Sequence, residues 1–472
     1  MKQTYFAKRI FFFFSIFVLK AFVLLSIPLH ANAEGFRLPE QSASGLGQAN
    51  AVTAQADDPS ALHFNPAGMV QLRRVQYSVG TSLVGSHFSF ESPAGVRATG
   101  DFDGPVANPP PSNFYLIAYL PDLGFHHFGP TTVGLGLTSP YGTLISFPKD
   151  APFATAGYFS ALPLIDIKPT FAIKLNEFLA LGAGIDIYTF ASFLGEGQAE
   201  LKQIAGSEFA DPSLSSLGIS PGDDLELNGT DTAVGFNLSV LVTPWRTSEG
   251  KPRLNLAFVY RSQVTLELKG DFRTNGRLIA DAKAELDLPQ IFTGGIAFWP
   301  LRNSQHEWKI EVDLDYADWS SFDNLDVKLS NGVILPQPRN WRGTIVVNVG
   351  TEYRWLSPSS LPDWEIALRG GYVRSETPIP ERTFEPTVPG SDYNGISIGV
   401  GLFCKDRGKF FGLITCQRGG EGWMAIRGIG LDLAYQALLY KSRTIRNNIL
   451  PVVNGTWDST FHIGSMNLRI NF

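Results

Sequence analysis

The sequence predicts an all-β protein, a transmembrane antiparallel β-barrel of about fourteen strands. Three observations predict this fold. The N-terminus has an export signal, many segments alternate apolar and polar side chains between aromatic ends, and the last such segment ends at the terminal residue, Phe472. A mean hydropathy of only +0.02 excludes a bundle of transmembrane helices.

The composition favours strands and tight turns over helices. The chain has 472 residues, with 35 Phe, 14 Tyr, 9 Trp and 47 Gly. Its net charge of −6 is spread along the chain, so we expect no nucleic-acid partner. Only two cysteines are present, which excludes a disulfide scaffold or a cysteine-rich metal site. We expect no cofactor and no bound metal.

The N-terminus predicts export from the cytoplasm. Three basic residues precede an apolar run from Ile10 to Leu29, and the small residues Ala31-Asn32-Ala33 follow it. A retained membrane anchor is the alternative, but Lys20 lies where a spanning helix least tolerates charge. We therefore expect a signal peptide over residues 1–33.

Residues 34–70 have no sustained periodicity, and from residue 71 to 472 the pattern has period two. The clearest strand is Trp308–Tyr316, in which apolar residues on one face alternate with charged residues on the other. A soluble sandwich would show the same alternation. The export signal, the aromatic ends and the terminal Phe472 favour the barrel. Such a terminal aromatic resembles the signal that the outer-membrane assembly machinery reads.

Fourteen runs of this kind can be counted, and an even number places both ends in the periplasm. They begin near Arg73, Ser112, Thr131, Gly157, Phe178, Thr232, Arg253, Leu286, Glu307, Trp341, Trp364, Asn394, Trp423 and Ser459. Between two of them, Leu201–Thr230 is expected to form a long outer loop that is partly helical. The turn from Phe403 to Trp423 is long where a short periplasmic turn is expected.

Cys404 and Cys416 both lie in this long turn. The periplasm is oxidising, and thiols that lie close together there form disulfides. The spacing therefore predicts a disulfide that closes the turn.

Several short fragments, in this order along the chain, resemble the FadL/TodX family of outer-membrane proteins. They are Glu34-Gly35-Phe36, Ser44-Gly45-Leu46-Gly47, Asn65-Pro66-Ala67, Thr138-Ser139-Pro140-Tyr141-Gly142, Lys168-Pro169-Thr170, Asp287-Leu288-Pro289 and Trp319-Ser320-Ser321-Phe322. The resemblance implies a monomeric barrel in outer-membrane lipid, with residues 34–70 as the hatch that plugs its lumen. It implies uptake of hydrophobic small molecules, either long-chain fatty acids or neutral aromatic hydrocarbons, and no enzymatic activity.

The resemblance also implies where a ligand is bound and released. Phe36 holds the family position in a pocket beside the start of the hatch, although it could simply anchor the segment. Asn65, Pro66 and Ala67 are expected to shape the hatch. The outer loop could capture the ligand in a groove formed by its apolar residues, or these residues could form a small core of the loop itself. They are Ile204, Phe209, Leu214 and Leu217.

Exit is expected sideways through the barrel wall, at a kinked third strand. The candidate is Thr131–Tyr141, where Pro140 lacks an N–H and Gly134 and Gly136 weaken strand pairing. The alternative is that Pro140 merely ends the strand.

One position departs from the family pattern and affects the expected ligand. Pro389-Gly390-Ser391-Asp392-Tyr393 lies where the family often has Pro-Asp-x-Asp-Arg, so a tyrosine replaces an arginine. A buried carboxylate needs a cationic partner. Arg253, Arg261, Lys309 and Arg369 are expected to face inward, although neighbouring acids could occupy them. We therefore favour fatty acids as the ligand, with hydrocarbons as the alternative.

Two other functions deserve comparison. Gly395-Ile396-Ser397-Ile398-Gly399 matches the nucleophile elbow of a lipase, but the elbow needs a strand-to-helix turn and strand alternation continues through it. A non-selective porin would need no hatch. The pair His126-His127 is expected to lie in a solvated turn, since no other ligands stand at metal-binding spacing.

Overall fold

The computed structural model describes residues 34–190, 197–210, 217–417 and 425–472. The predicted signal peptide, residues 1–33, lies outside them. Fourteen antiparallel strands form a barrel, and the first pairs with the last from Gln76–Asn471 to Glu91–Thr456. They are β1 (Val75–Glu91), β3 (Ser112–Tyr119), β4 (Thr131–Tyr141), β7 (Leu164–Lys174), β8 (Leu179–Phe190), β11 (Ala233–Arg246), β12 (Pro252–Arg261), β15 (Ile291–Arg302), β16 (His306–Ala317), β19 (Thr344–Trp355), β20 (Trp364–Ser375), β21 (Tyr393–Lys405), β24 (Gly428–Tyr440) and β26 (Gly455–Asn471).

The predicted barrel of fourteen strands is therefore confirmed. Closure leaves no unpaired strand edge to face lipid. Strand β16 shows the pattern that produces it: Trp308, Val312 and Leu314 are exposed on the outside, while Lys309 and Glu311 are fully buried on the inside. An apolar exterior and a polar interior are what a membrane barrel requires.

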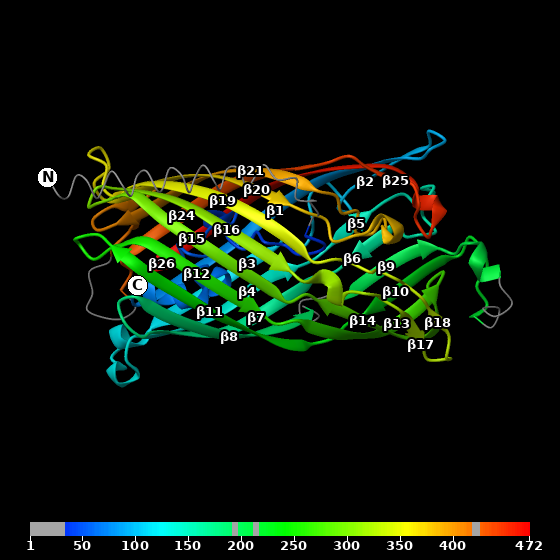
Figure 1. The fold of residues 1–472 in the computed structure, drawn as a ribbon, viewed down its shortest axis with the longest axis horizontal. Helices are drawn as coiled ribbons and strands as arrows, with labels where there is room; N and C mark the ends of the chain where they lie inside the picture. Colours follow the sequence, from blue (N-terminus) through cyan, green and yellow to red (C-terminus); the bar gives the residue numbers. More distant parts are fainter. Residues whose placement is uncertain (1–33, 191–196, 211–216, 418–424) are drawn as a thin grey trace. The chain divides into compact units, whose positions relative to one another are not determined.

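A second sheet continues the wall beyond the barrel, at the end away from the C-terminus (Figure 1). Its strands are β5 (Leu144–Ser146), β6 (Phe159–Ala161), β9 (Ala199–Ile204), β10 (Asp224–Gly229), β13 (Val264–Thr274), β14 (Arg277–Leu288), β17 (Val327–Leu329) and β18 (Ile334–Leu335). Two short strands, β2 (Arg97–Gly100) and β25 (Arg443–Ile445), extend β1 and β26 at the same end.

Sequence reasoning misplaced part of this outer region. The loop Leu201–Thr230 was expected to be partly helical, and its described part contains a 3-10 helix at Ser207–Ala210, but also the end of β9 and all of β10, which were not expected. The hairpin of β13 and β14 was not predicted, and the run expected from Leu286 begins at Ile291. These strands have the same period as the barrel strands, so alternation alone could not assign them to a second sheet.

The run expected from Gly157 begins at Leu164. The expected start at Trp423 lies outside the described residues, and β24 begins at Gly428. Over the described residues, no helix is both long and apolar enough to cross a membrane.

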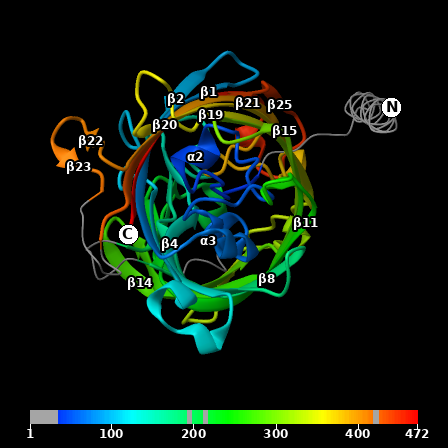
Figure 2. The ribbon, with the colours of Figure 1, turned by 90° about the vertical axis from the view of Figure 1, so that its left-hand side faces the viewer.

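Residues 34–70, which we call the hatch segment, run inside the ring of strands (Figure 2). The segment contains two short helices, α2 (Ala43–Leu46) and α3 (Ala61–Phe64). At its end the 3-10 helix η1 (Pro66–Gln71) leads the chain towards β1. Side chains cap these turns: Ser42 Oγ accepts from the Gly45 N–H at 3.0 Å, and Asn65 Oδ1 accepts from the Ala67 N–H at 3.1 Å. Such caps satisfy N–H groups that short helices cannot pair internally.

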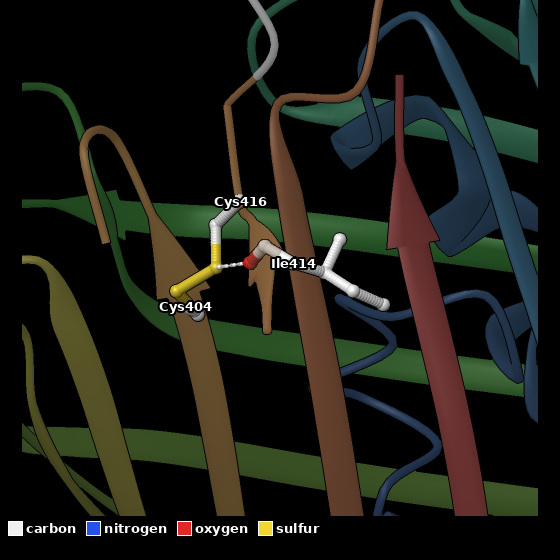
Figure 3. The surroundings of a disulfide bond; sticks show 3 residues. All are labelled: Cys404, Ile414 and Cys416. Atoms are coloured by element: carbon white, nitrogen blue, oxygen red, sulfur yellow. Dashed lines mark hydrogen bonds between the residues drawn. A yellow bond between two sulfur atoms is a disulfide. The ribbon is translucent and has the colours of Figure 1, made fainter. Parts of the chain in front are cut away.

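The predicted disulfide is confirmed. Cys404 at the end of β21 is bonded to Cys416, and the two Cα atoms lie 5.7 Å apart (Figure 3). Between them, β22 (Lys409–Phe410) pairs with β23 (Ile414–Thr415). The bond therefore closes a small hairpin at the end of the barrel that carries the short turns, which is the periplasmic end.

Because the chain holds no other cysteine, the disulfide can be tested chemically. We expect no alkylation by iodoacetamide in the unreduced, denatured protein, and alkylation of both cysteines after reduction. Mass spectrometry of the intact protein measures this. Two alkylated thiols without reduction would contradict the bond. Loss of the bond should lower stability by about 2–3 kcal/mol, since it constrains the unfolded chain.

Candidate functional site

Phe36 lies at the centre of an aromatic cluster at the start of the hatch segment. Its ring centroid is 4.8 Å from that of Trp319, 5.7 Å from that of Trp341 and 6.0 Å from that of Phe322. Tyr141, at the end of β4, packs on it from another side at 6.1 Å. Edge-to-face contacts of this kind fix ring orientation as well as burying area.

Gly35 makes this packing possible. Its φ of +66° is a conformation that side chains disfavour, and a Cβ there would lie 2.7 Å from the Trp341 ring and 2.9 Å from the Trp319 ring. On its other side the chain pairs with β4: the Gly142 N–H donates to Phe36 O at 2.9 Å, and the Leu38 N–H donates to Pro140 O at 2.8 Å. The start of the hatch segment thus adds a short extended stretch to β4.

Charged groups surround the cluster. Arg37 forms an ion pair with Asp315 of β16 at 2.8 Å. The hydroxyl of Tyr393 donates to Glu34 Oε1 at 2.9 Å, and burial raises the pKa of this carboxyl to about 7. Where the family often has an arginine, Tyr393 therefore gives Glu34 a neutral donor. In the loop before Tyr393, Asp392 forms an ion pair with Lys441 at 3.1 Å.

Strand β4 is irregular beside this cluster. Its ladder with β7 is regular up to the pair Thr138–Asp166 and resumes at Tyr141–Leu164. Its ladder with β3 ends at the pair Phe114–Leu137. The ladder therefore breaks at Ser139 and Pro140, whereas Gly134 and Gly136 keep their partners on both sides.

A side chain of the hatch segment occupies this break. Gln41 Nε2 donates to Ser139 O at 2.9 Å, and the Ser139 N–H donates to Gln41 Oε1 at 3.1 Å. The backbone groups that β3 leaves unpaired are thus satisfied by a residue of the hatch segment.

Inward-facing glycines form the seat of the hatch segment. A Cβ at Gly134 or Gly136 would lie 2.6 Å from the Leu62 side chain of α3. Gly350 and Gly371 are paired across β19 and β20, and a Cβ on either would collide with backbone atoms of Gln48 at 2.6 and 2.3 Å. At these positions any side chain would push the hatch away from the wall.

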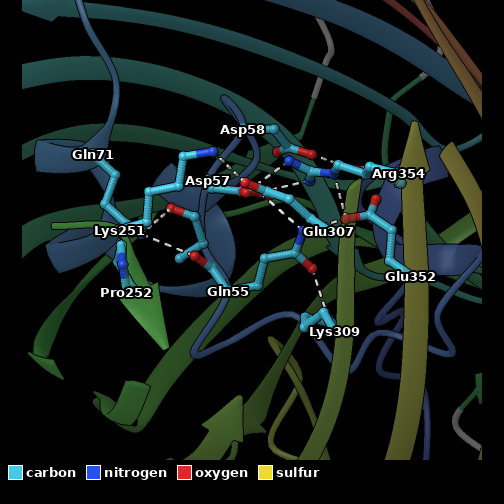
Figure 4. A network of polar contacts seen from close by, with 12 residues as sticks. Gln55, Asp57, Asp58, Gln71, Lys251, Pro252, Glu307, Lys309, Glu352 and Arg354 are labelled. Atoms are coloured by element: carbon cyan, nitrogen blue, oxygen red, sulfur yellow. Dashed lines mark hydrogen bonds and ion pairs between the residues drawn. The ribbon is translucent and has the colours of Figure 1, made fainter. Parts of the chain in front are cut away.

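Buried charges of β16 and β19 also hold the hatch segment (Figure 4). Arg354 binds Asp57 through two hydrogen bonds of 2.9 and 3.1 Å and pairs with Glu352 at 2.5 Å. Lys309 donates to Gln55 Oε1 at 2.7 Å and pairs with Glu311 at 2.9 Å. Breaking a buried pair on one side costs several kcal/mol, because it leaves an unpaired charge.

The same wall also binds the hatch backbone. The Ala54 N–H donates to Glu311 at 2.6 Å, and the Thr53 N–H donates to Asp313 at 2.9 Å. Across the lumen, Ser239 of β11 accepts from the Ala67 N–H at 2.9 Å. The segment is therefore held by side chains of several strands around the barrel.

A cavity of about 110 Å³ lies between Phe36 and the second sheet. It has room for several water molecules, or for a stretch of alkyl chain. Most of its wall is apolar, with Leu162, Leu201, Leu227, Leu268 and Leu286 among the lining residues.

Among the described residues that line it, Arg339 is the only buried cation. Its guanidinium pairs with Glu385, another lining residue, at 2.9 Å. Arg339 Nε is buried and has no hydrogen-bond partner among the described residues.

The predicted ligand contacts are only partly brought together. Phe36 lines the cavity. Phe209 and Leu217 are buried instead in a separate core of the outer loop, with Phe272 and other residues of the second sheet. Ile204 packs at the edge of the central core, and Leu214 lies outside the described residues.

The hatch fragment Asn65-Pro66-Ala67 contacts protein and not the cavity. Asn65 donates to Thr53 O at 2.8 Å, which joins two turns of the segment. The backbone of Pro66 and Ala67 packs against Gly182 of β8, where a Cβ would lie 2.4 Å from the Ala67 nitrogen. Asn65 thus contacts another turn of the hatch segment, and Pro66 and Ala67 contact the barrel wall.

The cations that were expected to face the lumen are already engaged. Lys309 binds the hatch, Arg369 pairs with Glu352 at 2.7 Å and with Asp432 at 2.6 Å, and Arg261 donates to His63 O. Arg253 lies instead over the exposed ring of Trp245. Sequence reasoning missed Arg339, because it lies in a loop without periodicity, and Trp341, which was taken only as the start of a strand.

Two competing interpretations fail on geometry. Gly395–Gly399, the lipase-like fragment, lies within β21, so its serine is not on a strand-to-helix turn. His126 and His127 lie in the 3-10 helix η3 (His126–Phe128), outside the ladders, and in the described part of the chain no cluster of metal-ligating side chains forms.

Comparisons with known proteins agree with this geometry. The long-chain fatty acid transport protein of Salmonella typhi is 24% identical over 393 residues, which covers 79% of this chain and 85% of the relative. The protein of the same name from Escherichia coli K12 is 25% identical over 410 residues, again covering 79% and 85%.

Solved structures show the same fold. The crystal structure of a Pseudomonas aeruginosa FadL homologue superimposes with a TM-score of 0.70 at 18% identity, covering 93% of this chain and all of that one. The Pseudomonas putida toluene transporter TodX gives a TM-score of 0.59 at 17% identity, with 88% and 94% covered.

The family model described as outer membrane protein transport protein (OMPP1/FadL/TodX) matches residues 24–407. That match covers most of the chain, and it includes the hatch segment, the irregular β4 and the aromatic cluster around Phe36. The chain therefore belongs to the OMPP1/FadL/TodX family, whose members are outer-membrane transporters of hydrophobic compounds.

Proposed function

We propose that this protein takes up long-chain fatty acids and releases them sideways into the membrane. The observation that carries the proposal is the apolar cavity with Phe36 at one end and a buried arginine in its wall. An alkyl chain gains free energy by leaving water for such a cavity, roughly 0.8 kcal/mol for each buried CH₂. A water-filled pore would offer no such gain.

The hatch segment argues against passage straight through the lumen. It is held by glycine contacts on β4 and on β19 and β20, and by buried charged side chains of β16 and β19. Clearing the lumen would break all of them together. Moving only its first residues, Glu34 to Gln41, would instead leave the ion pairs of Asp57 and Lys309 intact.

The irregular part of β4 supports a lateral route. In the described ladders Ser139 and Pro140 have no strand partner, and Gln41 and Leu38 of the hatch segment bond to them. If the first residues of the segment move, the wall loses these bonds between β3 and β4. Ligand displacing Phe36 from its aromatic cluster would therefore also open the wall.

Ligand class depends on Arg339. A carboxylate that reaches the cavity can bind this guanidinium in competition with Glu385, with a charge-assisted hydrogen bond worth about 1.5–3 kcal/mol. A neutral hydrocarbon has no charged group to bind the guanidinium of Arg339. Neutral aromatic hydrocarbons are the second candidate, because the ring cluster around Phe36 would also suit an aromatic ligand.

Uptake in cells tests the proposed function directly. The protein should restore oleate uptake in an outer membrane that lacks its own fatty acid transporter, measured with radiolabelled oleate at matched barrel expression. Uptake of toluene without oleate would instead establish the second candidate. Uptake of neither would contradict both.

Two variants with opposite expected effects test the role of Arg339. Arg339→Met should lower oleate affinity about tenfold or more, because the carboxylate loses its cation. Glu385→Gln should raise oleate affinity, because it removes the competing acid. Tryptophan fluorescence titration measures both. Lys328→Met, a change of the same kind on β17 outside the cavity, serves as control. Equal affinities for oleate in all three variants would exclude a contact between Arg339 and the ligand.

Substitution of two adjacent glycines, which lie on opposite faces of β20, tests whether the hatch segment blocks the lumen. In Gly371→Val the new side chain should displace the segment at Gln48 and raise single-channel conductance to small ions in planar bilayers. Gly370→Val is the control, since a Cβ at Gly370 has no neighbour closer than 3.9 Å. The same low conductance in both variants, with both barrels folded, would show that the segment is not a plug.

A further inference from the structure

The hairpin closed by the disulfide folds against the outside of the barrel. Along β21 the side chains of Ile396 and Ile398 are exposed on the lipid face, and Cys404 falls on this face by the same alternation. Yet Cys404 is completely buried, because the chain returning from Gly408 to Cys416 covers it. Figure 2 shows β22 and β23 outside the ring of strands.

A ring contact continues the lipid-facing surface onto the hairpin. Phe410 stacks on Trp364, with ring centroids 6.0 Å apart and planes inclined by 21°. Trp364 pairs with Cys404 across β20 and β21, and it stands on the same face as the exposed Leu368 and Tyr372. The hairpin is therefore continuous with the aromatic end of the barrel's own membrane-facing band.

The tip of the hairpin exposes large apolar side chains. Leu413 is 87% exposed, and Phe411 and Ile414 are also exposed. Among the described residues nothing covers them. Phe411 and Gly412 both have positive φ, which forms the tight turn that presents them.

Cations flank the apolar tip. Arg407 and Lys409 are exposed, and neither forms an ion pair with any described residue, whereas Lys405 pairs with Glu365 at 2.8 Å. Apolar and aromatic residues beside unpaired Lys and Arg are typical of segments that lie in a membrane interface. At the periplasmic end of an outer-membrane barrel, the adjacent leaflet is phospholipid.

We propose that this hairpin, residues 405–416, is a membrane-interface anchor. Phe411, Leu413 and Ile414 enter the acyl region of the periplasmic leaflet, and Arg407 and Lys409 lie at its phosphates. The disulfide holds the hairpin against the outer wall at the depth where the apolar tip meets lipid. A periplasmic protein is the other class of partner that could cover such a tip, and the experiment separates the two.

Photocrosslinking from the tip identifies what covers it. The full chain carrying Leu413→benzoylphenylalanine is reconstituted into vesicles of phosphatidylethanolamine and phosphatidylglycerol and irradiated. A second variant, Ile334→benzoylphenylalanine, is the matched control, because Ile334 is 58% exposed but lies in the second sheet at the other end of the barrel. Mass spectrometry of the labelled peptide should show about tenfold more phospholipid adduct at 413 than at 334.

Equal lipid adduct at the two positions would overturn the proposal. So would irradiation of intact cells that gives a protein adduct at 413 and no lipid adduct. Hydrogen exchange is measured on the unsubstituted protein, so its result does not depend on whether the substituted variants fold. Amides of residues 409–415 should exchange several-fold more slowly in the bilayer than in a lipid-free amphipathic polymer, and equal rates would also overturn it.

Discussion

The packing of the hatch segment against the inner wall is the contact on which the rest of the structure depends. A barrel of fourteen strands encloses a lumen that its own side chains do not fill. Here glycines on several strands let the segment approach the wall to backbone distance, and buried acids and cations fix its register. Without it, Lys309 would lose its hydrogen bond to Gln55, Glu311 would lose the Ala54 N–H, and Arg354 would lose Asp57.

One segment therefore takes part in three features that lie close together. Its first residues bring Phe36 to the end of the cavity, Arg37 to Asp315 and Gln41 to the break in β4. The proposed ligand pocket and the proposed lateral opening share a single short stretch of chain. A displacement of that stretch changes both at once, which is the physical basis of coupling between two sites.

The sequence predicted those features that follow from local period or from ordered fragments. Strand β16, the closing strand at Phe472, the irregular third strand and the disulfide all carry such signals. The aromatic cluster could be anticipated in part, because Phe36, Tyr141, Trp319 and Phe322 stand in fragments that resemble the family. Arg339 and Tyr393 could not be, since their partners Glu385 and Glu34 are known only once the chain has folded. The same holds for the second sheet, whose strands share the period of the barrel.

The glycines of the inner wall imply that barrel and hatch are not independent modules. Leu62 fits between Gly134 and Gly136 only because those two positions have no side chain, and Gln48 lies against Gly350 and Gly371 for the same reason. A hatch taken from a relative fits this wall only if its large side chains fall opposite the same glycines. Recombination within such a family should therefore succeed mainly where the segment and its inward-facing strand positions are inherited together, so that the two parts evolve as one surface.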